Sequence, residues 1–181
     1  MKIIYYVHST SIDNINHVCS GWNDVELSDK GINQAKNLSS LTSYKFDILF
    51  TSDLKRARDT AKLAWPNMRF IEDVRLRECN YGDLDGLSKD LIKYEEYIDD
   101  SFPNGESLKD VEYRIREFIE YVKERYRGKT IGIIAHRATQ LALEVILNNK
   151  TWEDAIKEDW RNLGNWQPGW EYEIKEDVWY E

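Results

Sequence analysis

The sequence predicts an α/β fold, a three-layer sandwich in which helices cover both faces of a mostly parallel central sheet. Two observations lead to this fold class. Short runs of consecutive apolar residues recur along the chain, and such runs are typical of strands that are buried on both faces. Between them lie segments in which apolar residues recur every three or four positions, as they do on one face of a helix. Strands that alternate with helices in this way form a parallel sheet.

Five segments are predicted to form strands. Residues 3–7, 46–50 and 130–135 are continuous apolar runs. Residues 69–71 form a shorter and weaker strand. Residues 169–175 alternate between apolar and polar side chains, which is typical of a strand at the edge of a sheet.

Helices are predicted between these strands. Ser28 and Ser52 are expected to cap helices that extend to about residues 41 and 64. Ser107 opens the clearest helix, because Ser107 and Asp110 form the pattern of a capping box before a long apolar stripe. Two shorter helices are predicted at residues 138–147 and 151–159.

The length and composition agree with one globular domain that spans residues 1–181. Hydrophobic residues make up 41% of the chain and charged residues 32%, which is a globular rather than a disordered composition. The net charge of −8 argues against nucleic acid and anionic membrane surfaces as partners. Any small anionic substrate must therefore meet a local cluster of basic side chains.

No segment has the pattern of a membrane helix or a cleaved signal peptide, since the apolar runs are far shorter than about 20 residues. The two cysteines, Cys19 and Cys79, form no CxxC pair, so neither a disulfide framework nor a zinc site is indicated. We therefore expect a soluble, cytoplasmic protein without a metal or other cofactor. Both cysteines are expected to pack as small apolar side chains.

Side chains with catalytic chemistry follow three of the predicted strands. His8 and His136 each come directly after a strand, and Arg56 lies in the first helical turn after another strand. The carboxyl ends of parallel strands meet at one edge of a sheet, where α/β proteins bind their ligands. One neutral histidine can attack phosphorus, while the other histidine and the guanidinium hold charge on the phosphate oxygens. Glu78, in a loop-like stretch, is a candidate acid for the leaving oxygen.

Each of these residues also has a structural interpretation. A histidine at a strand end is commonly an ordinary hydrogen-bonded residue, and Arg56 fits the surface of a helix. An exposed Glu78 would be unremarkable as well. The coincidence of two histidines at separate strand ends makes a shared site as reasonable as the structural interpretation.

Six segments resemble motifs of the histidine phosphatase superfamily, which has the phosphoglycerate-mutase-like fold. Residues 52–61 (SDLKRARDTA) match the family's S-D-L-x-R-A-x-x-T-A segment, and residues 76–86 match its acid-bearing loop. The other matching segments, in the family's order, are residues 7–14, 20–35, 103–107 and 135–136. The resemblance extends from His8 to about Leu147, and it implies the fold predicted above.

The resemblance also implies roles for single residues. His8 would be the nucleophile that forms a phosphohistidine, and Arg56 and His136 would bind the phosphoryl oxygens. Glu78 would protonate the leaving oxygen and later activate water. Further residues at positions where family members contact phosphate or substrate are Asn14, Ser20, Gly21 and Tyr81.

The chain departs from the family pattern beside both histidines. The family's opening Arg-His-Gly is replaced by Val7-His8-Ser9, and Arg137 stands where a glycine usually follows the second histidine. Loss of one preorganised donor typically lowers a rate by about 10²–10³, or roughly 3–4 kcal/mol. We hypothesise that Arg137 supplies the missing guanidinium and that the hydroxyls of Ser9, Thr10 and Ser11 add donors. The alternative is that Arg137 points to solvent or pairs with an acidic residue.

The expected function is that of a phosphatase, a phosphomonoester hydrolase acting on a small cytoplasmic phosphorylated metabolite. One alternative is a catalytically weakened domain that binds phosphate and serves in regulation, which the loss at Val7 favours. Another is a phosphoglycerate mutase, although the chain leaves little room for a helical insertion between Glu78 and Pro103.

The end of the chain is rich in tryptophan. We expect these indoles to pack the last helix and the edge strand, because buried aromatic side chains contribute a large apolar area. The functional alternative is a substrate lid or a subunit contact, the latter in a homodimer. The five residues are Trp152, Trp160, Trp166, Trp170 and Trp179.

Overall fold

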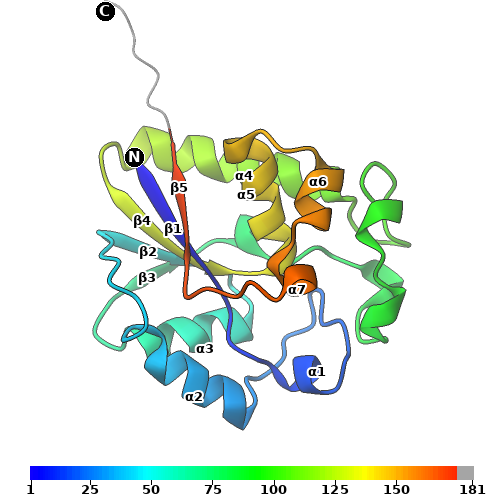
Figure 1. Cartoon of the computed structure of the whole chain (residues 1–181), viewed down its shortest axis with the longest axis horizontal. Coiled ribbons are helices and arrows are strands. Elements are labelled where there is room, and N and C mark those ends of the chain that lie inside the picture. Colours follow the sequence, from blue (N-terminus) through cyan, green and yellow to red (C-terminus); the bar gives the residue numbers. More distant parts are fainter. Residues whose placement is uncertain (175–181) are drawn as a thin grey trace, which may run out of the picture.

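The computed structural model of the protein describes residues 1–174. Its centre is a five-stranded sheet with the order β3-β2-β4-β1-β5 (Figure 1). Strands β1 to β4 are parallel, and β5 pairs with β1 in the antiparallel direction at one edge. The strands are β1 (Lys2–Val7), β2 (Ile48–Thr51), β3 (Phe70–Glu72), β4 (Thr130–Ala135) and β5 (Trp170–Glu173). The predicted mostly parallel sheet with an edge strand is confirmed.

Helices cover both faces of this sheet (Figure 1). One face carries α2 (Asp29–Leu38) and α3 (Lys55–Ala64), and the other carries α4 (Leu108–Arg125) and α5 (Arg137–Asn148). Shorter elements are α1 (Ile12–Ile15), α6 (Trp152–Lys157) and α7 (Trp160–Leu163), with 3₁₀ turns η1 (Val74–Leu76), η2 (Gly82–Leu84), η3 (Lys89–Leu91) and η4 (Tyr94–Glu96).

The apolar run of β1 explains why the sheet needs cover on both faces. Ile3 and Tyr5 pack into the core cluster under α4 and α5, whereas Ile4 and Tyr6 pack into the cluster under α3. Successive strand residues point to opposite faces, so a strand in the middle of a two-sided sheet must be apolar throughout. Because β1 runs parallel to β4, which in turn runs parallel to β2, His8, directly after β1, lies at the carboxyl edge of the sheet.

The serine caps are partly as predicted. The capping box of α4 is confirmed, since Ser107 accepts from the backbone of Asp110 and the Asp110 side chain accepts in return. Ser28 caps α2 by accepting from the Gly31 N–H at 3.1 Å. The predicted cap at Ser52 is wrong, because α3 begins at Lys55. The buried Ser52 hydroxyl accepts from the Leu54 N–H at 3.2 Å and so shapes the turn before the helix.

The helix predicted at residues 151–159 is divided in the structure. After α6, the Asp159 side chain accepts from the Arg161 N–H at 3.0 Å and starts the separate short helix α7. Gly164, in the left-handed conformation at φ +68°, ends α7. This added turn lies near the carboxyl end of β1 (Figure 1).

Two further expectations concern the described residues. No helix within residues 1–174 is both long and apolar enough to cross a membrane. Cys19 and Cys79 are buried and carry free thiols, as predicted. Of the tryptophans, Trp152 is buried, while Trp179 lies outside the described residues.

Candidate active site

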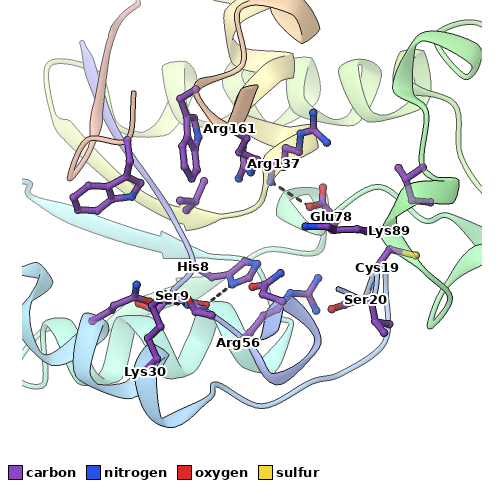
Figure 2. Close-up of a pocket in the computed structure, with 18 of the residues that line it drawn as sticks. His8, Ser9, Cys19, Ser20, Lys30, Arg56, Glu78, Lys89, Arg137 and Arg161 are labelled. Carbon is purple, nitrogen blue, oxygen red and sulfur yellow. Dashed lines mark hydrogen bonds between the residues drawn. The ribbon is translucent and has the colours of Figure 1, made fainter. Parts of the chain in front are cut away.

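A large cavity opens at the carboxyl edge of the sheet (Figure 2). Its volume is about 1520 Å³. His8, Arg56 and Glu78, which come from three separate parts of the chain, all line it. His136 lies beside His8, with the two ring centroids 5.1 Å apart. The four residues that were expected to share one site are therefore brought together.

The His8 side chain presents one ring nitrogen for chemistry. Its Nδ1 lies 2.7 Å from the Ser9 carbonyl oxygen, so Nδ1 carries the hydrogen and donates it. Nε2 then holds the lone pair. Burial, followed by the positive charge of Arg56, lowers the pKa of His8 to about 3. The imidazole is consequently neutral near pH 7, which is the form that can act as a nucleophile.

His136 is fully buried at the end of β4. Its backbone N–H donates to the Tyr5 hydroxyl at 2.8 Å, which fixes the position of the residue. Neither ring nitrogen has a hydrogen-bond partner among the described residues. Burial, then the charge of Arg56, lowers the pKa of His136 well below its usual value. A buried imidazole without a protein partner is costly, and a phosphate oxygen would supply the partner.

Arg56 is a buried cation in the first turn of α3, only 1% exposed. Its Nη1 donates to the Asn23 carbonyl at 2.9 Å, and its Nη2 donates to the Gly21 carbonyl at 2.8 Å. Gly21 has φ +47°, and a Cβ there would lie 1.6 Å from the Asp85 Oδ1 atom. The positive φ and this close approach both favour glycine here, and the loop that directs the guanidinium includes this residue.

The Glu78 carboxylate lies against the first turn of α5. Oε1 accepts from the backbone N–H groups of Ala138 at 2.9 Å and Cys79 at 3.1 Å. Oε2 accepts from the Arg137 N–H at 3.2 Å, as Figure 2 shows. These three backbone donors, two of them at the N-terminus of α5, hold the carboxylate in one orientation.

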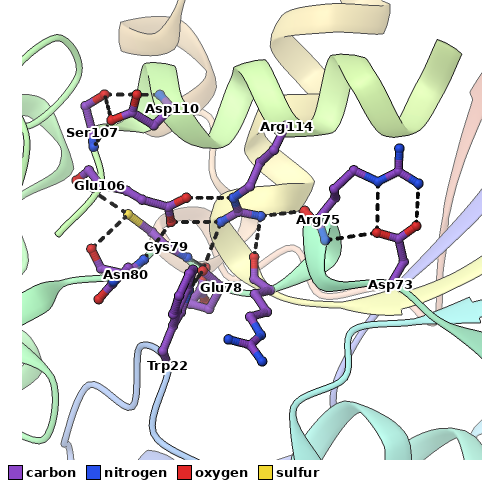
Figure 3. Close-up of polar contacts among 11 residues, drawn as sticks. Trp22, Asp73, Arg75, Glu78, Cys79, Asn80, Glu106, Ser107, Asp110 and Arg114 are labelled. Atoms are coloured by element: carbon purple, nitrogen blue, oxygen red, sulfur yellow. Dashed lines mark hydrogen bonds and ion pairs between the residues drawn. The ribbon is translucent and has the colours of Figure 1, made fainter. Parts of the chain in front are cut away.

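Arg114 of α4 holds the loop that carries Glu78 (Figure 3). Its guanidinium donates to the carbonyl oxygens of Arg75 at 2.5 Å, Arg77 at 2.7 Å and Glu78 at 2.9 Å. The same guanidinium pairs with Glu106 at 2.8 Å. We refer to Arg114 and Glu106, with these contacts, as the bracket. No sequence pattern predicted it, although Glu106 lies within the matched segment at residues 103–107.

The predicted substrate-binding residues all line the cavity: Ser9, Asn14, Ser20, Gly21, Tyr81 and Arg137. Several of their polar groups are already engaged. The Ser9 N–H donates to the Thr60 hydroxyl at 3.0 Å, and the Tyr81 and Tyr94 hydroxyl oxygens lie 2.7 Å apart. The Ser9 hydroxyl as a phosphate donor stays a prediction.

Arg137 pairs with an acidic residue, which was the alternative to its phosphate-binding role. Its Nε donates to the Asp159 Oδ2 at 2.5 Å, and its guanidinium carbon lies 4.4 Å from the centroid of the Tyr94 ring. Since Arg137 also lines the cavity, its contribution to substrate binding stays a prediction.

Three basic residues of the lining were missed by the sequence analysis. They are Lys30 of α2, Lys89 of η3 and Arg161 of α7. Lys30 lies in the matched segment at residues 20–35, but at a position where the family pattern specifies no residue, and Lys89 and Arg161 lie in no matched segment. With Arg56 and Arg137 counted, basic side chains outnumber acidic ones in the lining by five to two. The cavity is thus locally positive on a chain of net charge −8, as an anion site requires.

An α/β sandwich with two histidines, a buried arginine and a carboxylate at its strand ends has the architecture of an enzyme acting on phosphate esters. Within residues 1–174, no group of three or more His, Cys, Asp or Glu side chains is placed to hold a metal ion. The sequence profile of the histidine phosphatase superfamily (branch 1) matches residues 7–163. The chain belongs to this superfamily.

Its curated relatives include mutases. The 2,3-bisphosphoglycerate-dependent phosphoglycerate mutase of Bartonella bacilliformis is 32% identical over 173 aligned positions, covering 84% of this chain and 84% of the relative. The phosphoglycerate mutase of Schizosaccharomyces pombe is 34% identical over 173 positions, covering 84% of this chain and 82% of the relative.

Solved structures with the same fold include phosphatases. The mycobacterial glucosyl-3-phosphoglycerate phosphatase superposes with a TM-score of 0.77 at 25% identity, covering 85% of each chain. The alpha-ribazole phosphatase of Shigella flexneri superposes with a TM-score of 0.76 at 24% identity, covering 87% of this chain and 84% of that one, and this likeness concerns the fold. The expectation of an enzyme of the histidine phosphatase family is confirmed.

Proposed function

We propose that the protein is a phosphomonoester hydrolase that transfers the phosphoryl group of a small metabolite to His8 and then to water. The observation that carries this proposal is the state of His8. Its Nδ1 is bound to the Ser9 carbonyl, so the neutral ring has its Nε2 lone pair free. Arg56 and His136 lie beside this nucleophile, as the stabilisation of phosphoryl oxygens requires.

In the first step, the bond from Nε2 of His8 to phosphorus forms as the bond to the ester oxygen breaks. The Arg56 guanidinium and the ring of His136 stabilise the charge on the phosphoryl oxygens. Glu78 donates a proton to the leaving oxygen.

In the second step, water attacks the phosphohistidine. Glu78, now a carboxylate, takes a proton from this water as the bond between phosphorus and nitrogen breaks. Phosphate leaves and His8 returns to its neutral form. The three backbone N–H groups around Glu78 hold its side chain in position for both steps.

The cavity favours a substrate whose leaving group is itself polar. Its volume of about 1520 Å³ exceeds the 300–1,000 Å³ that is common for ligand pockets. In addition to His8, the lining of the cavity contains Lys30, Lys89 and the indole of Trp166. These side chains suit a metabolite with further anionic or hydroxyl groups, as the names of the phosphatase neighbours describe for their own substrates.

A mutase is the second candidate, because the curated relatives are phosphoglycerate mutases. The short segment between Glu78 and Pro103 favours hydrolysis over the mutase reaction. It contains only the 3₁₀ turns η2, η3 and η4 and no α-helix, as expected from its length. A short covering segment leaves the phosphohistidine accessible to water.

Product analysis separates these functions. The protein should release inorganic phosphate from at least one member of a panel of phosphorylated sugars and glycerates, and His8→Asn should abolish this release. The matched control is His17→Asn, because His17 is an exposed histidine at φ +56°, a conformation that asparagine tolerates. An isomerised phosphoglycerate without phosphate release would establish the mutase. A folded protein that binds phosphate but releases none would establish the weakened binding domain.

A further inference from the structure

We propose that Arg161 supplies the phosphate-binding guanidinium that the family's opening motif provides and that Val7 lacks. This inference rests on the proposed function. Val7, the last residue of β1, lines the cavity without a charge. Arg161 of α7 lines the same cavity, on the wall opposite His8 and Arg56 (Figure 2).

A single buried carboxylate holds Arg161 in place. The Asp159 side chain is fully buried, and its Oδ1 accepts from Nη1 of Arg161 at 3.2 Å and from the Arg161 backbone at 3.0 Å. Its Oδ2 accepts from Nε of Arg137 at 2.5 Å. We call the three side chains, Arg137, Asp159 and Arg161, the Asp159 clasp.

The charge of the Asp159 clasp equals that of the missing residue. Two guanidinium groups and one carboxylate leave one net positive charge, which is what a single arginine at position 7 would contribute. One guanidinium is enough to pair the buried carboxylate, which would be strongly destabilising if it were unpaired. The second arginine therefore remains as an excess cation beside the cavity.

The aromatic contacts distinguish the two arginines. The guanidinium of Arg137 lies over Tyr94, whereas that of Arg161 lies 4.3 Å from the centroid of the Trp160 ring. Trp160 itself lines the cavity. Stacking on an indole limits the rotation of the guanidinium, so Arg161 is preorganised toward the cavity.

The charge of Arg161 reaches both catalytic histidines. Burial and then Arg56 lower the pKa of both histidines most, and Arg161 adds a smaller effect in the same direction, which for His136 also follows those of His8 and Arg114. A phosphoryl group on His8 would therefore have Arg56 on one side and Arg161 on the other. The Arg161 guanidinium has five N–H donors, and Asp159 uses only one of its nitrogens, so donors remain for phosphate oxygens.

The test compares Arg161→Ala with the wild type in two measurements: kcat/KM for a phosphomonoester that the wild type hydrolyses, and the affinity for orthovanadate. Arg161→Ala should lower kcat/KM about 10²–10³-fold and weaken vanadate binding, as expected for the loss of one preorganised donor. Arg161→Lys should recover part of the loss, since lysine keeps the positive charge but lacks the planar guanidinium with its paired donors. Arg127→Ala, at an exposed arginine in the turn before β4, removes an equal charge and should change both values less than threefold.

Restoring the family's arginine provides the decisive comparison. In a Val7→Arg background, Arg161→Ala should cost less than about tenfold, because two guanidinium groups that serve one phosphate are not additive. An Arg161→Ala protein within threefold of the wild type in kcat/KM and vanadate affinity would overturn the inference, whether or not Val7→Arg folds. Equal losses in both backgrounds would also overturn it. A wild type that hydrolyses no phosphomonoester would instead refute the proposed function.

Discussion

Substitution of Arg114 tests whether the bracket formed by Arg114 and Glu106 attaches the loop that carries Glu78 to α4. Arg114 is 12% exposed and Glu106 is 18% exposed, so the pair is largely shielded from water. Replacing Arg114 with methionine retains an unbranched apolar stem but removes every donor. The loop that carries Glu78 would then lose its main attachment to α4.

The expected cost follows from the contacts removed. Three carbonyl oxygens, of Arg75, Arg77 and Glu78, lose a charged donor, and Glu106 loses its cationic partner. Glu106 retains the Asn80 N–H at 2.9 Å, which compensates for part of the loss. Breaking one side of a buried ion pair costs about 3–5 kcal/mol, and we expect the free energy of unfolding to fall by that amount.

Equilibrium unfolding in urea measures this change, and a control lies on the same helix. Arg116 is 53% exposed and pairs with Glu112 one turn away at 2.6 Å, so Arg116→Met should cost less than about 1 kcal/mol. Arg114→Met should also lower kcat, because Glu78 is no longer held against α5. If the free energies of unfolding of Arg114→Met and Arg116→Met differ by less than about 1 kcal/mol, the bracket does not hold the loop as described.

Three further predictions concern His8, His136 and Gly21. His8 has a folded-state pKa of about 3 against 6.5 in the unfolded chain, so unfolding takes up protons in this range and stability must fall as the pH drops from about 6.5 toward 3. The fall should be shallower in His8→Asn, as urea titrations at several pH values would show. His136→Phe should leave the free energy of unfolding unchanged or higher, since the ring nitrogens have no partner among the described residues, yet weaken phosphate binding about 10–100-fold in calorimetry. Gly21→Ala should lower thermal stability and phosphate affinity together, because its Cβ would collide with Asp85 and displace a carbonyl that holds Arg56; unchanged melting would show that the loop can shift.

The central sheet and the edge that carries the candidate site could be predicted because they depend on local sequence patterns. The unbroken apolar run of β1 reports burial on both faces, and the strand direction then places His8 and His136 at one edge. The cap of α4 was predictable because Ser107 and Asp110 interact within one helical turn.

The missed features depend on contacts between distant parts of the chain. Asp159 caps the separate helix α7, and it also pairs with Arg137, 22 residues earlier in the chain. These two contacts bring Arg161 to the cavity. Arg114 reaches back across 36 residues to the Glu78 carbonyl. Ser52 has the composition of a helix cap, but its burial at the end of β2 directs its hydroxyl to the turn instead. No periodicity within a single segment reports such pairings.

The most direct test of the central claim is a search for phosphate bound to His8 during turnover. A phosphomonoester labelled with radioactive phosphate would be mixed with the protein and quenched in alkali, in which phosphohistidine survives. The account predicts an acid-labile phosphate that maps to the peptide containing His8, present in His17→Asn and absent in His8→Asn. Steady release of phosphate with no label on His8, or label that persists in His8→Asn, would contradict it.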